Sequence, residues 1–279
     1  MNMRMLTAIG VALAVFLSAA AVESTYVSSS GSATAPYDSW EKAAHDLATA
    51  AAETDVGGTV RIAPGTYAVS ETIVLDKALT VRSADPETDA VAPSTTILDG
   101  GSACGIVSVR AAVSFVGLTF SHGSATGNGG ALCVTAYAGG GGCENCIFSG
   151  NVVAAPATVA LAGGRYALAV AGCSADNSNP VFRNCVFEGN ALEPAEAEGV
   201  TAVLCEGVLL GGKGESTVEH CTFVSPKADS DYAVAQFGST QKALTVKDSV
   251  FELEDGEAWK RFVFADQPST VTVANCQVR

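Results

Sequence analysis

A four-residue phrase, polar–small–any–hydrophobic, recurs five times in the C-terminal half of the chain and constrains the fold more than any other feature. The copies are Asn145-Cys146-Ile147-Phe148, Asn184-Cys185-Val186-Phe187, His220-Cys221-Thr222-Phe223, Asp248-Ser249-Val250-Phe251 and Asn275-Cys276-Gln277-Val278. Their last residues are 39, 36, 28 and 27 positions apart. Self-similarity on this scale is typical of a solenoid, in which each repeat forms one rung that stacks on its neighbours.

Positions within the phrase have distinct expected roles, which together define a structural ladder. The second and fourth residues lie two apart, on one face of a strand, so we expect them to point into the core. These core candidates are Cys146, Phe148, Cys185, Phe187, Cys221, Phe223, Phe251 and Cys276. The first position tolerates a left-handed bend and can hydrogen-bond its counterpart one rung away. The bend candidates are Asn145, Asn184, His220, Asp248 and Asn275, so we interpret His220 as a bend residue rather than a catalyst.

The N-terminus predicts export from the cell. Residues 1–21 combine Arg4, an apolar run and the small residues 18–21, the pattern of a cleaved signal peptide; a membrane anchor is the alternative. No later stretch predicts a transmembrane segment. We therefore expect a secreted protein, extracellular, at the cell surface or periplasmic.

Three further regions follow the signal peptide. Residues 22–37 predict a flexible lead-in, residues 38–56 a capping helix and residues 57–279 the solenoid. Asp38 and Glu41 have the spacing of a capping box at the start of that helix. Its apolar face can cover the open end of the first rung. Beyond residue 57, short β-prone segments alternate with glycine and Pro-Gly turns, which predicts an all-β fold of about seven to nine rungs, one per repeat length.

Charge narrows the classes of ligand. The formal net charge is −14, and charged residues make up only 16% of the chain. Such a surface repels nucleic acid and anionic membranes, which bind clustered Lys and Arg. Anionic polysaccharides are disfavoured as well unless calcium bridges the like charges.

Nine cysteines in an exported chain leave two interpretations open. A cysteine that recurs at an inward slot can form a buried, mostly reduced stack. Disulfides between neighbouring rungs are the alternative, although a straight ladder seldom has the right geometry. Cys143 and Cys146 also have metal-site spacing, but no second pair or nearby histidine completes a site in the sequence.

Other segments resemble a known family. Thr59 to Tyr67, a strand ending in Ala-Pro-Gly-Thr-Tyr, resembles the opening rung of right-handed parallel β-helix proteins of the pectin-lyase type. Gly129-Gly130-Ala131-Leu132, followed by Phe148-Ser149-Gly150-Asn151 and Phe187-Glu188-Gly189-Asn190, is similar to polymorphic outer-membrane protein repeats. The resemblance implies a single-stranded right-handed parallel β-helix. It does not fix a function, because that fold carries lyases, hydrolases, adhesins and tailspikes.

The sequence contains few candidates for chemistry. Arg183 lies in no motif of the lyase type, and His122 occurs only in a fragment, Ser-His-Gly, of the polygalacturonase turn. His45 is expected on the surface of the capping helix. An oxygen-rich loop with Asp176, Asn177 and Asn179 is a weak calcium candidate, with a plain polar turn as the alternative. No other cofactor is indicated.

We therefore expect a non-catalytic β-helix scaffold, adhesin-like, that binds a polysaccharide or a surface protein. The alternative is a polysaccharide lyase or glycoside hydrolase of the pectin-lyase group. End-to-end assembly of the solenoid is a third hypothesis, because no C-terminal cap is evident in the sequence after Cys276.

Overall fold

The computed structural model describes most of the chain after the N-terminal segment. The described residues are 22–126, 129–134, 141–155, 157–161, 164–170, 173–176, 180–192, 201–211, 214–224, 232–236, 242–252, 263–265 and 271–279. The predicted signal peptide, residues 1–21, lies outside them.

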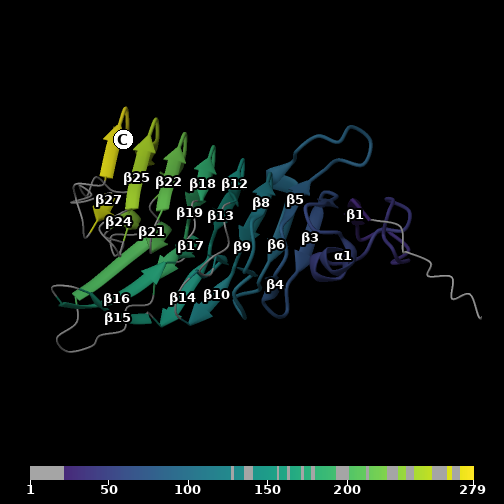
Figure 1. Cartoon of the computed structure of the whole chain (residues 1–279), viewed down its shortest axis with the longest axis horizontal. Helices are drawn as coiled ribbons and strands as arrows, with labels where there is room; N and C mark the ends of the chain where they lie inside the picture. The colour runs from purple at the N-terminus through teal and green to yellow at the C-terminus, as the bar shows by residue number, and fades with distance from the viewer. Residues whose placement is uncertain are drawn as a thin grey trace, which may run out of the picture.

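The chain coils into a parallel β-helix whose rungs stack along the long axis of the molecule (Figure 1). Three long sheets, here called A, B and C, run along the coil, and a short sheet D joins the middle rungs. Sheet A contains β1 (Ser24–Val27), β2 (Thr59–Ile62), β5 (Leu79–Ser83), β8 (Val113–Val116), β12 (Gly141–Glu144), β18 (Val181–Arg183), β22 (Gly214–Glu219), β25 (Lys242–Lys247) and β28 (Val271–Ala274). Sheet B contains β3 (Gly65–Ala68), β6 (Thr96–Asp99), β9 (Thr119–Ser121), β13 (Ile147–Ser149), β19 (Val186–Glu188), β23 (Thr222–Val224), β26 (Val250–Glu252) and β29 (Gln277–Val278).

The third side of the coil is less regular. Sheet C contains β4 (Ile73–Leu75), β7 (Val107–Val109), β11 (Leu132–Val134), β15 (Ala157–Leu161), β16 (Gly164–Val170), β17 (Cys173–Asp176), β21 (Thr201–Gly211), β24 (Tyr232–Gln236) and β27 (Val263–Ala265). Sheet D contains β10 (Ser124–Thr126), β14 (Val152–Ala155) and β20 (Ala191–Leu192). Within sheet C, β15 and β16 pair antiparallel, which departs from the purely parallel coil that the sequence predicts.

Register is continuous from rung to rung in sheets A and B. The phrase strands β13, β19, β23 and β26 pair in parallel, with Phe148, Phe187, Phe223 and Phe251 directly in register. Within the described residues, sheet A has nine strands and the coil passes this side nine times, within the range that the repeat length predicts. Strands of two to six residues suffice in these two sheets because each has a hydrogen-bonded neighbour above and below, except at the two ends of the coil.

The N-terminal cap differs from the prediction. The helix α1 runs only from Leu47–Glu53, and its N-cap is Asp46, whose carboxylate accepts from the Thr49 amide at 2.7 Å. Asp38 and Glu41 therefore do not form the predicted capping box. Residues 38–46 cannot be helical, because their backbone bonds the lead-in instead: the Ala44 amide donates to the Tyr26 carbonyl at 2.9 Å.

The predicted lead-in, residues 22–37, is likewise part of the fold. Its strand β1 pairs in parallel with β2 and forms the first strand of sheet A. Helix α1 packs against β1, β2 and β4, with Leu47, Ala50 and Ala51 buried. The helix therefore has the location that the sequence predicts, over the first rung, although it is shorter.

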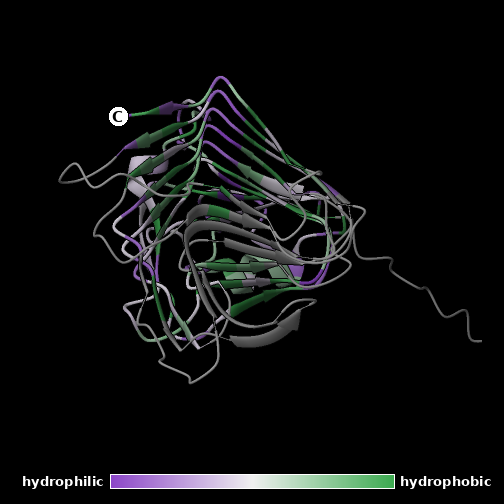
Figure 2. Ribbon diagram, turned by 90° about the vertical axis from the view of Figure 1, so that its left-hand side faces the viewer, coloured by the Kyte–Doolittle hydropathy of each residue, from purple (hydrophilic) through white to green (hydrophobic). Residues whose placement is uncertain are grey.

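The core fills the coil along its whole length. Inward positions alternate with outward positions along each strand, as the β2 burial pattern illustrates with Val60 and Ile62 buried and Thr59 and Arg61 half-buried. Figure 2 looks along the coil and shows that the bends between sheets A and B align in a hydrophilic ridge at the top of the view. The described polar side chains that can contact a ligand therefore lie on outer faces and corners.

Candidate functional site

A stack of phenylalanine rings, here the phenylalanine stack, runs through the core behind sheet B. Phe120, Phe148, Phe187, Phe223 and Phe251 are fully buried. Successive ring centroids lie 5.1, 4.7, 4.9 and 5.2 Å apart, with interplanar angles of 12°, 5°, 6° and 8°. Nearly parallel rings at these distances contribute beyond their buried area. The predicted inward column is confirmed.

Cysteines form a second column beside the rings. Cys146, Cys185 and Cys221 are buried, and each thiol donates to carbonyl oxygens at 3.4–3.6 Å. Burial raises the pKa of the Cys185 thiol, and the neighbouring sulfurs of Cys146 and Cys221 raise it further. Ser249 takes the same slot before Cys276. The cysteines whose side chains are described carry thiols rather than disulfides, and Cys143 is a core residue.

The corner between sheets A and B has left-handed backbone in every phrase. The φ angles are 53° at Asn145, 52° at Asn184, 53° at His220, 51° at Asp248 and 54° at Asn275, which confirms the predicted bend. Asn275 donates to Asp248 at 3.2 Å across one rung, and the His220 ring lies 3.9 Å from Asp248 on the other side. His220 therefore occupies the predicted bend slot.

Two buried asparagines, which the sequence analysis did not identify as structural, hold the next corner. The Asn151 side chain donates to the Phe120 carbonyl at 3.0 Å and accepts from the Gly123 amide at 2.7 Å. Asn190 repeats the role one rung on, donating to the Phe148 carbonyl at 3.0 Å. The signal was the shared Phe-x-Gly-Asn string at 148–151 and 187–190. It indicates an internal hydrogen-bonded column rather than a ligand site.

His122 belongs to a polar cluster, but not to a catalytic relay. Ser121 Oγ lies 2.9 Å and Asp99 Oδ1 lies 3.2 Å from the same ring nitrogen, Nδ1. A serine nucleophile and an orienting carboxylate must instead contact opposite nitrogens of the ring. His122 has a φ of 51°, so it holds a corner of the coil.

Two outward columns of side chains run in register along sheet A. The first, here the hydroxyl column, is Ser24, Thr59, Thr80, Ser114, Gly142, Val181, Thr217, Thr245 and Thr272. The second, here the charged column, is Tyr26, Arg61, Arg82, Val116, Glu144, Arg183, Glu219, Lys247 and Ala274. Serine or threonine thus occupies every place in the hydroxyl column except Gly142 and Val181.

From Glu144 to Lys247 the sign of the charge alternates along the charged column, and Arg183, Glu219 and Lys247 form ion pairs. Glu219 accepts from Arg183 Nε at 2.6 Å, and its other oxygen lies 2.6 Å from Lys247 Nζ. Hydrogen bonds from Lys247 and Arg183 lower the pKa of the Glu219 carboxyl, although burial opposes them. The Glu219 side chain is only 8% exposed because the two cations cover it. Arg183, considered above as a lyase base, is thus engaged by a carboxylate.

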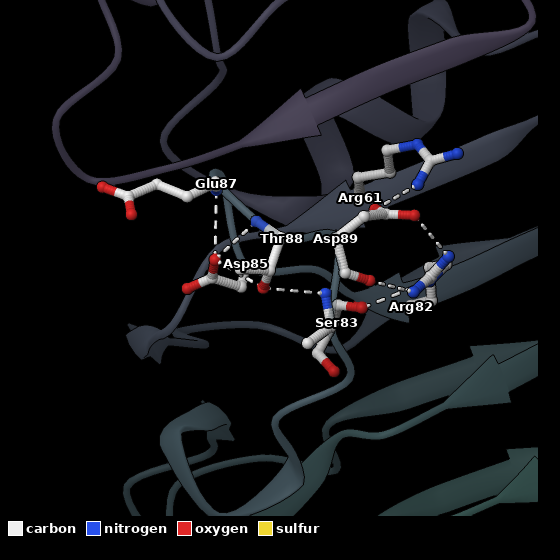
Figure 3. A network of polar contacts seen from close by, with 8 residues as sticks. Arg61, Arg82, Ser83, Asp85, Glu87, Thr88 and Asp89 are labelled. Atoms are coloured by element: carbon white, nitrogen blue, oxygen red, sulfur yellow. Dashed lines mark hydrogen bonds and ion pairs between the residues drawn. The ribbon is translucent and has the colours of Figure 1, made fainter.

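Nearer the N-terminus, a long β5–β6 connection braces the same column. This segment, residues 84–95, is here called the strap, and it ends in the short 3-10 helix η1 (Pro93–Thr95). Its Asp89 carboxylate contacts Arg61 Nη1 at 2.5 Å and Arg82 Nη1 at 3.1 Å (Figure 3). Asp85 closes the turn by accepting from the Glu87 and Thr88 amides at 3.0 and 2.9 Å.

The weak calcium candidates are not tested. Asn177 and Asn179 lie outside the described residues, and Asp176 is described only as the end of β17. Within the described ranges, no group of three or more His, Cys, Asp or Glu side chains is placed to hold a metal ion. His45, on the segment before α1, contacts the Gly31 carbonyl through Nε2 at 2.8 Å. As for membranes, the only α-helix in the described part of the chain is the seven-residue α1, too short to cross a bilayer.

Comparison with known proteins places the fold. A family model described as a right-handed β-helix region matches residues 94–278. Among solved structures, the pectin methylesterase of Aspergillus niger in its deglycosylated form is similar, with 13% identity, 93% of this chain and 87% of that chain covered, and a TM-score of 0.42. At that score the likeness carries no argument about activity, and no curated protein matches the chain. Because the family model covers well over half of its residues, the chain belongs to the right-handed β-helix family.

Proposed function

We propose that this protein is a secreted or surface-exposed, non-catalytic scaffold that binds a glycan along the outer face of sheet A. The observation that carries the proposal is the pair of columns on that face. A row of hydroxyl groups at the spacing of β-strands, about 4.8 Å, presents the same donors and acceptors at each rung. A polymer of repeating sugars can meet such a row more than once along its length.

Charge supports a neutral glycan rather than an acidic one. Within the charged column, Arg183 and Lys247 are offset by Glu219 and Glu144, and Arg61 and Arg82 contact Asp89. The face therefore offers hydrogen bonds without a large field of either sign. The net charge of −14 over the whole chain disfavours polyanions at long range.

Aromatic side chains at the N-terminal end of the face also favour sugar binding. Tyr26 begins the charged column, and the Trp40 ring meets it edge-to-face with centroids 4.7 Å apart. Both side chains are half-buried. Aromatic rings with one apolar face and one polar tip are suited to the mixed surface of a sugar.

The catalytic alternative has less support on this face. A lyase of the kind considered above needs an arginine that is free to take a proton, whereas Arg183 is held by Glu219 at 2.6 Å. The other conspicuous cluster, at His122, directs both partners to one ring nitrogen. A surface protein as partner remains an outcome of the test.

The test combines binding with product analysis. Purified protein is run by affinity electrophoresis in gels that contain soluble neutral glucans, xylan or uronic-acid polymers, with and without calcium. We expect retardation by a neutral polymer, with no new reducing ends or unsaturated products. Product formation would show that the protein is an enzyme and not a non-catalytic scaffold. The absence of retardation in every polysaccharide gel would reject glycan binding and favour a protein partner.

A paired variant checks the face. Replacing both Thr80 and Thr245 by Val removes two hydroxyls and keeps a β-branched shape, so binding should weaken about tenfold. Thr222→Val is the matched control, because Thr222 points outward from sheet B. Equal weakening by the control would remove sheet A as the binding face.

A further inference from the structure

The hydroxyl column is interrupted at two adjacent rungs, and a cavity opens there. Gly142 and Val181 replace serine or threonine in β12 and β18. The cavity, here called the notch, has a volume of about 120 Å³. Its lining includes Ser114 and Val181 beside the glycine pair Gly141–Gly142, with Glu144 and Arg183 from the charged column.

Backbone geometry fixes the notch. Gly141 and Gly142 have φ angles of 110° and 152°. A Cβ atom on Gly141 would lie 2.2 Å from the Val113 carbonyl oxygen, and one on Gly142 would lie 2.0 Å from that of Val181. No side chain can therefore occupy these positions without moving the neighbouring strands. Glycine in a strand interior often marks a place where a ligand or another backbone approaches closely.

Polar groups in the notch have unused bonding capacity. Arg183 meets Glu219 through Nε and Nη2, which leaves the Nη1 donors of its guanidinium. Glu144 is exposed and lies in register with Arg183, and among the residues that the structure describes no ion pair to Glu144 is present. The Glu144 carboxylate as acceptor, the Arg183 Nη1 group as donor and the Ser114 hydroxyl thus line the same notch.

Apolar surface completes the site. Val181 is 37% exposed and stands between Gly142 and Thr217 in the hydroxyl column. Val181 lines the notch together with Glu144 and Arg183, so the notch offers both C–H contact and hydrogen bonds. At about 120 Å³ it is smaller than typical pockets of roughly 300–1,000 Å³, and therefore takes one substituent of a ligand rather than a whole ligand.

We propose that the notch is the anchoring subsite for one sugar unit of a neutral glycan, whose hydroxyl or hydroxymethyl group lies between Glu144 and Arg183. This inference rests on the proposed function, because the rest of the glycan then lies along the hydroxyl column. A uronate is disfavoured, because its carboxylate would stand beside Glu144. The ion pair between Arg183 and Glu219 fixes the guanidinium, and therefore its Nη1 donors, in place.

Two variants test the notch without altering the core. Ser114→Val fills part of the notch with a larger side chain that is favoured in strands, and it removes the hydroxyl. Glu144→Gln removes the negative charge of the acceptor. The matched controls lie on sheet B: Thr222→Val, an outward threonine, and Glu188→Gln, an exposed glutamate. Circular dichroism and thermal unfolding verify that all four variants fold.

Binding to a soluble neutral glucan is measured by affinity electrophoresis, and methyl β-glucoside is titrated by amide chemical-shift mapping. We expect each notch variant to weaken glucan binding about tenfold, as one good hydrogen bond or filled contact would, and the controls less than about twofold. Amide shifts should cluster at Gly141 and Gly142.

The outcomes separate the two proposals. Glucan binding with unaffected notch variants, or with shifts elsewhere on sheet A, would overturn the subsite and leave the scaffold proposal standing. Binding of a uronic-acid polymer in preference to the neutral glucan would overturn the stated ligand class. Failure of the wild-type protein to bind any polysaccharide would overturn both.

Discussion

The N-terminal rungs and the later rungs build the same column in different ways. From Phe120 onward, one ring type repeats and each ring packs on its own copy. In the earlier rungs the positions in register are Leu98 and Tyr67, which differ in size and polarity. Those rungs gain additional support from α1 and from the strap. The contrast teaches that a coil can be stabilised by self-repetition or by individual contacts, and that only the first leaves a sequence signature.

The corner beside sheet A shows the same contrast. In the later rungs an Asn, His or Asp supplies the left-handed residue. In the rung of β8 the equivalent residue is Gly117, with a φ of 64°. A Cβ there would lie 1.8 Å from Val91 Cγ1 of the strap, so the strap fills the place of a corner side chain.

The largest test compares the two ways of filling the column. Phe187→Ala removes a ring stacked on both sides, so we expect the free energy of unfolding to fall by about 3–5 kcal/mol. Leu98→Ala in the earlier region should cost about 2–4 kcal/mol, because no ring stack is lost. Urea unfolding measures both. A Phe187 variant that loses less than the Leu98 variant would contradict the idea that the stack adds stability beyond burial.

Alkaline pH should weaken the N-terminal rungs through Tyr67. Burial raises the pKa of Tyr67 from 10.0 to about 12, and its hydroxyl donates to the Ala63 carbonyl at 2.9 Å. The folded state holds this proton more tightly than the unfolded state does. The stabilisation that neutral Tyr67 contributes is therefore complete below pH 10 and is lost as pH rises towards 12. We expect a loss of about 2 kcal/mol over that window.

Tyr67→Phe provides the control for this window. The variant should be about 1 kcal/mol less stable at neutral pH, because the hydroxyl bond is gone. Its stability should then fall less steeply than that of the wild type between pH 10 and 12. Parallel curves for the two proteins, measured by urea unfolding at each pH, would show that Tyr67 does not titrate as described.

A smaller effect is expected at the corner of the later rungs. Asn145→Ala keeps the positive φ but loses the side chain that tolerates it, at a cost of about 1 kcal/mol. Asn145→Gly should change stability by less than about 0.5 kcal/mol, since glycine adopts this φ freely. Thermal unfolding of both variants decides the point, and equal destabilisation would mean that cross-rung bonding matters more than the bend.

The smallest change concerns the strap. Asp89→Asn removes the negative charge between Arg61 and Arg82, whose side chains are 25% and 22% exposed. We expect a loss of under about 1 kcal/mol that shrinks in high salt. Limited proteolysis should cut the strap faster in this variant, with Glu87→Gln as the control. No change in either measurement would mean that the packing of Val91 near Gly117 and the 2.7 Å hydrogen bond from Thr119 Oγ1 to the Pro93 carbonyl hold the strap without the ion pairs.

The sequence predicted the repeated features of the coil and failed at the features that occur only once. The phrase predicted the inward Cys and Phe slots and the bend residues, because each role recurs at a fixed offset. The start of the cap helix was wrong: Asp38 and Glu41 satisfy a local rule, but β1 takes the backbone bonds of that segment. Strand β1 itself was missed, since a single Ser-Thr-Tyr-Val run has no repeat to support it.

The outer face could not be predicted in the same way. The pairing of Arg183 with Glu219 joins residues 36 positions apart, and that of Glu219 with Lys247 depends on the register of β22 and β25. The notch depends on which rungs place Gly142 beside Val181. Register is a tertiary property, and the loops whose lengths set it vary from rung to rung. Residue types alone therefore did not identify this face.

The fixed corner between sheets A and B has a consequence for how such a chain can change in length. Each corner consists of two strands joined by a single left-handed residue, and its size is constant. The remainder of each turn varies in length, so successive phrases are 27 to 39 residues apart. Insertions in the part of the turn outside this corner therefore leave the corner and its neighbouring strands in place. Whole turns can be duplicated or deleted at matching corners, so the length of sheet A can change in steps of one strand spacing.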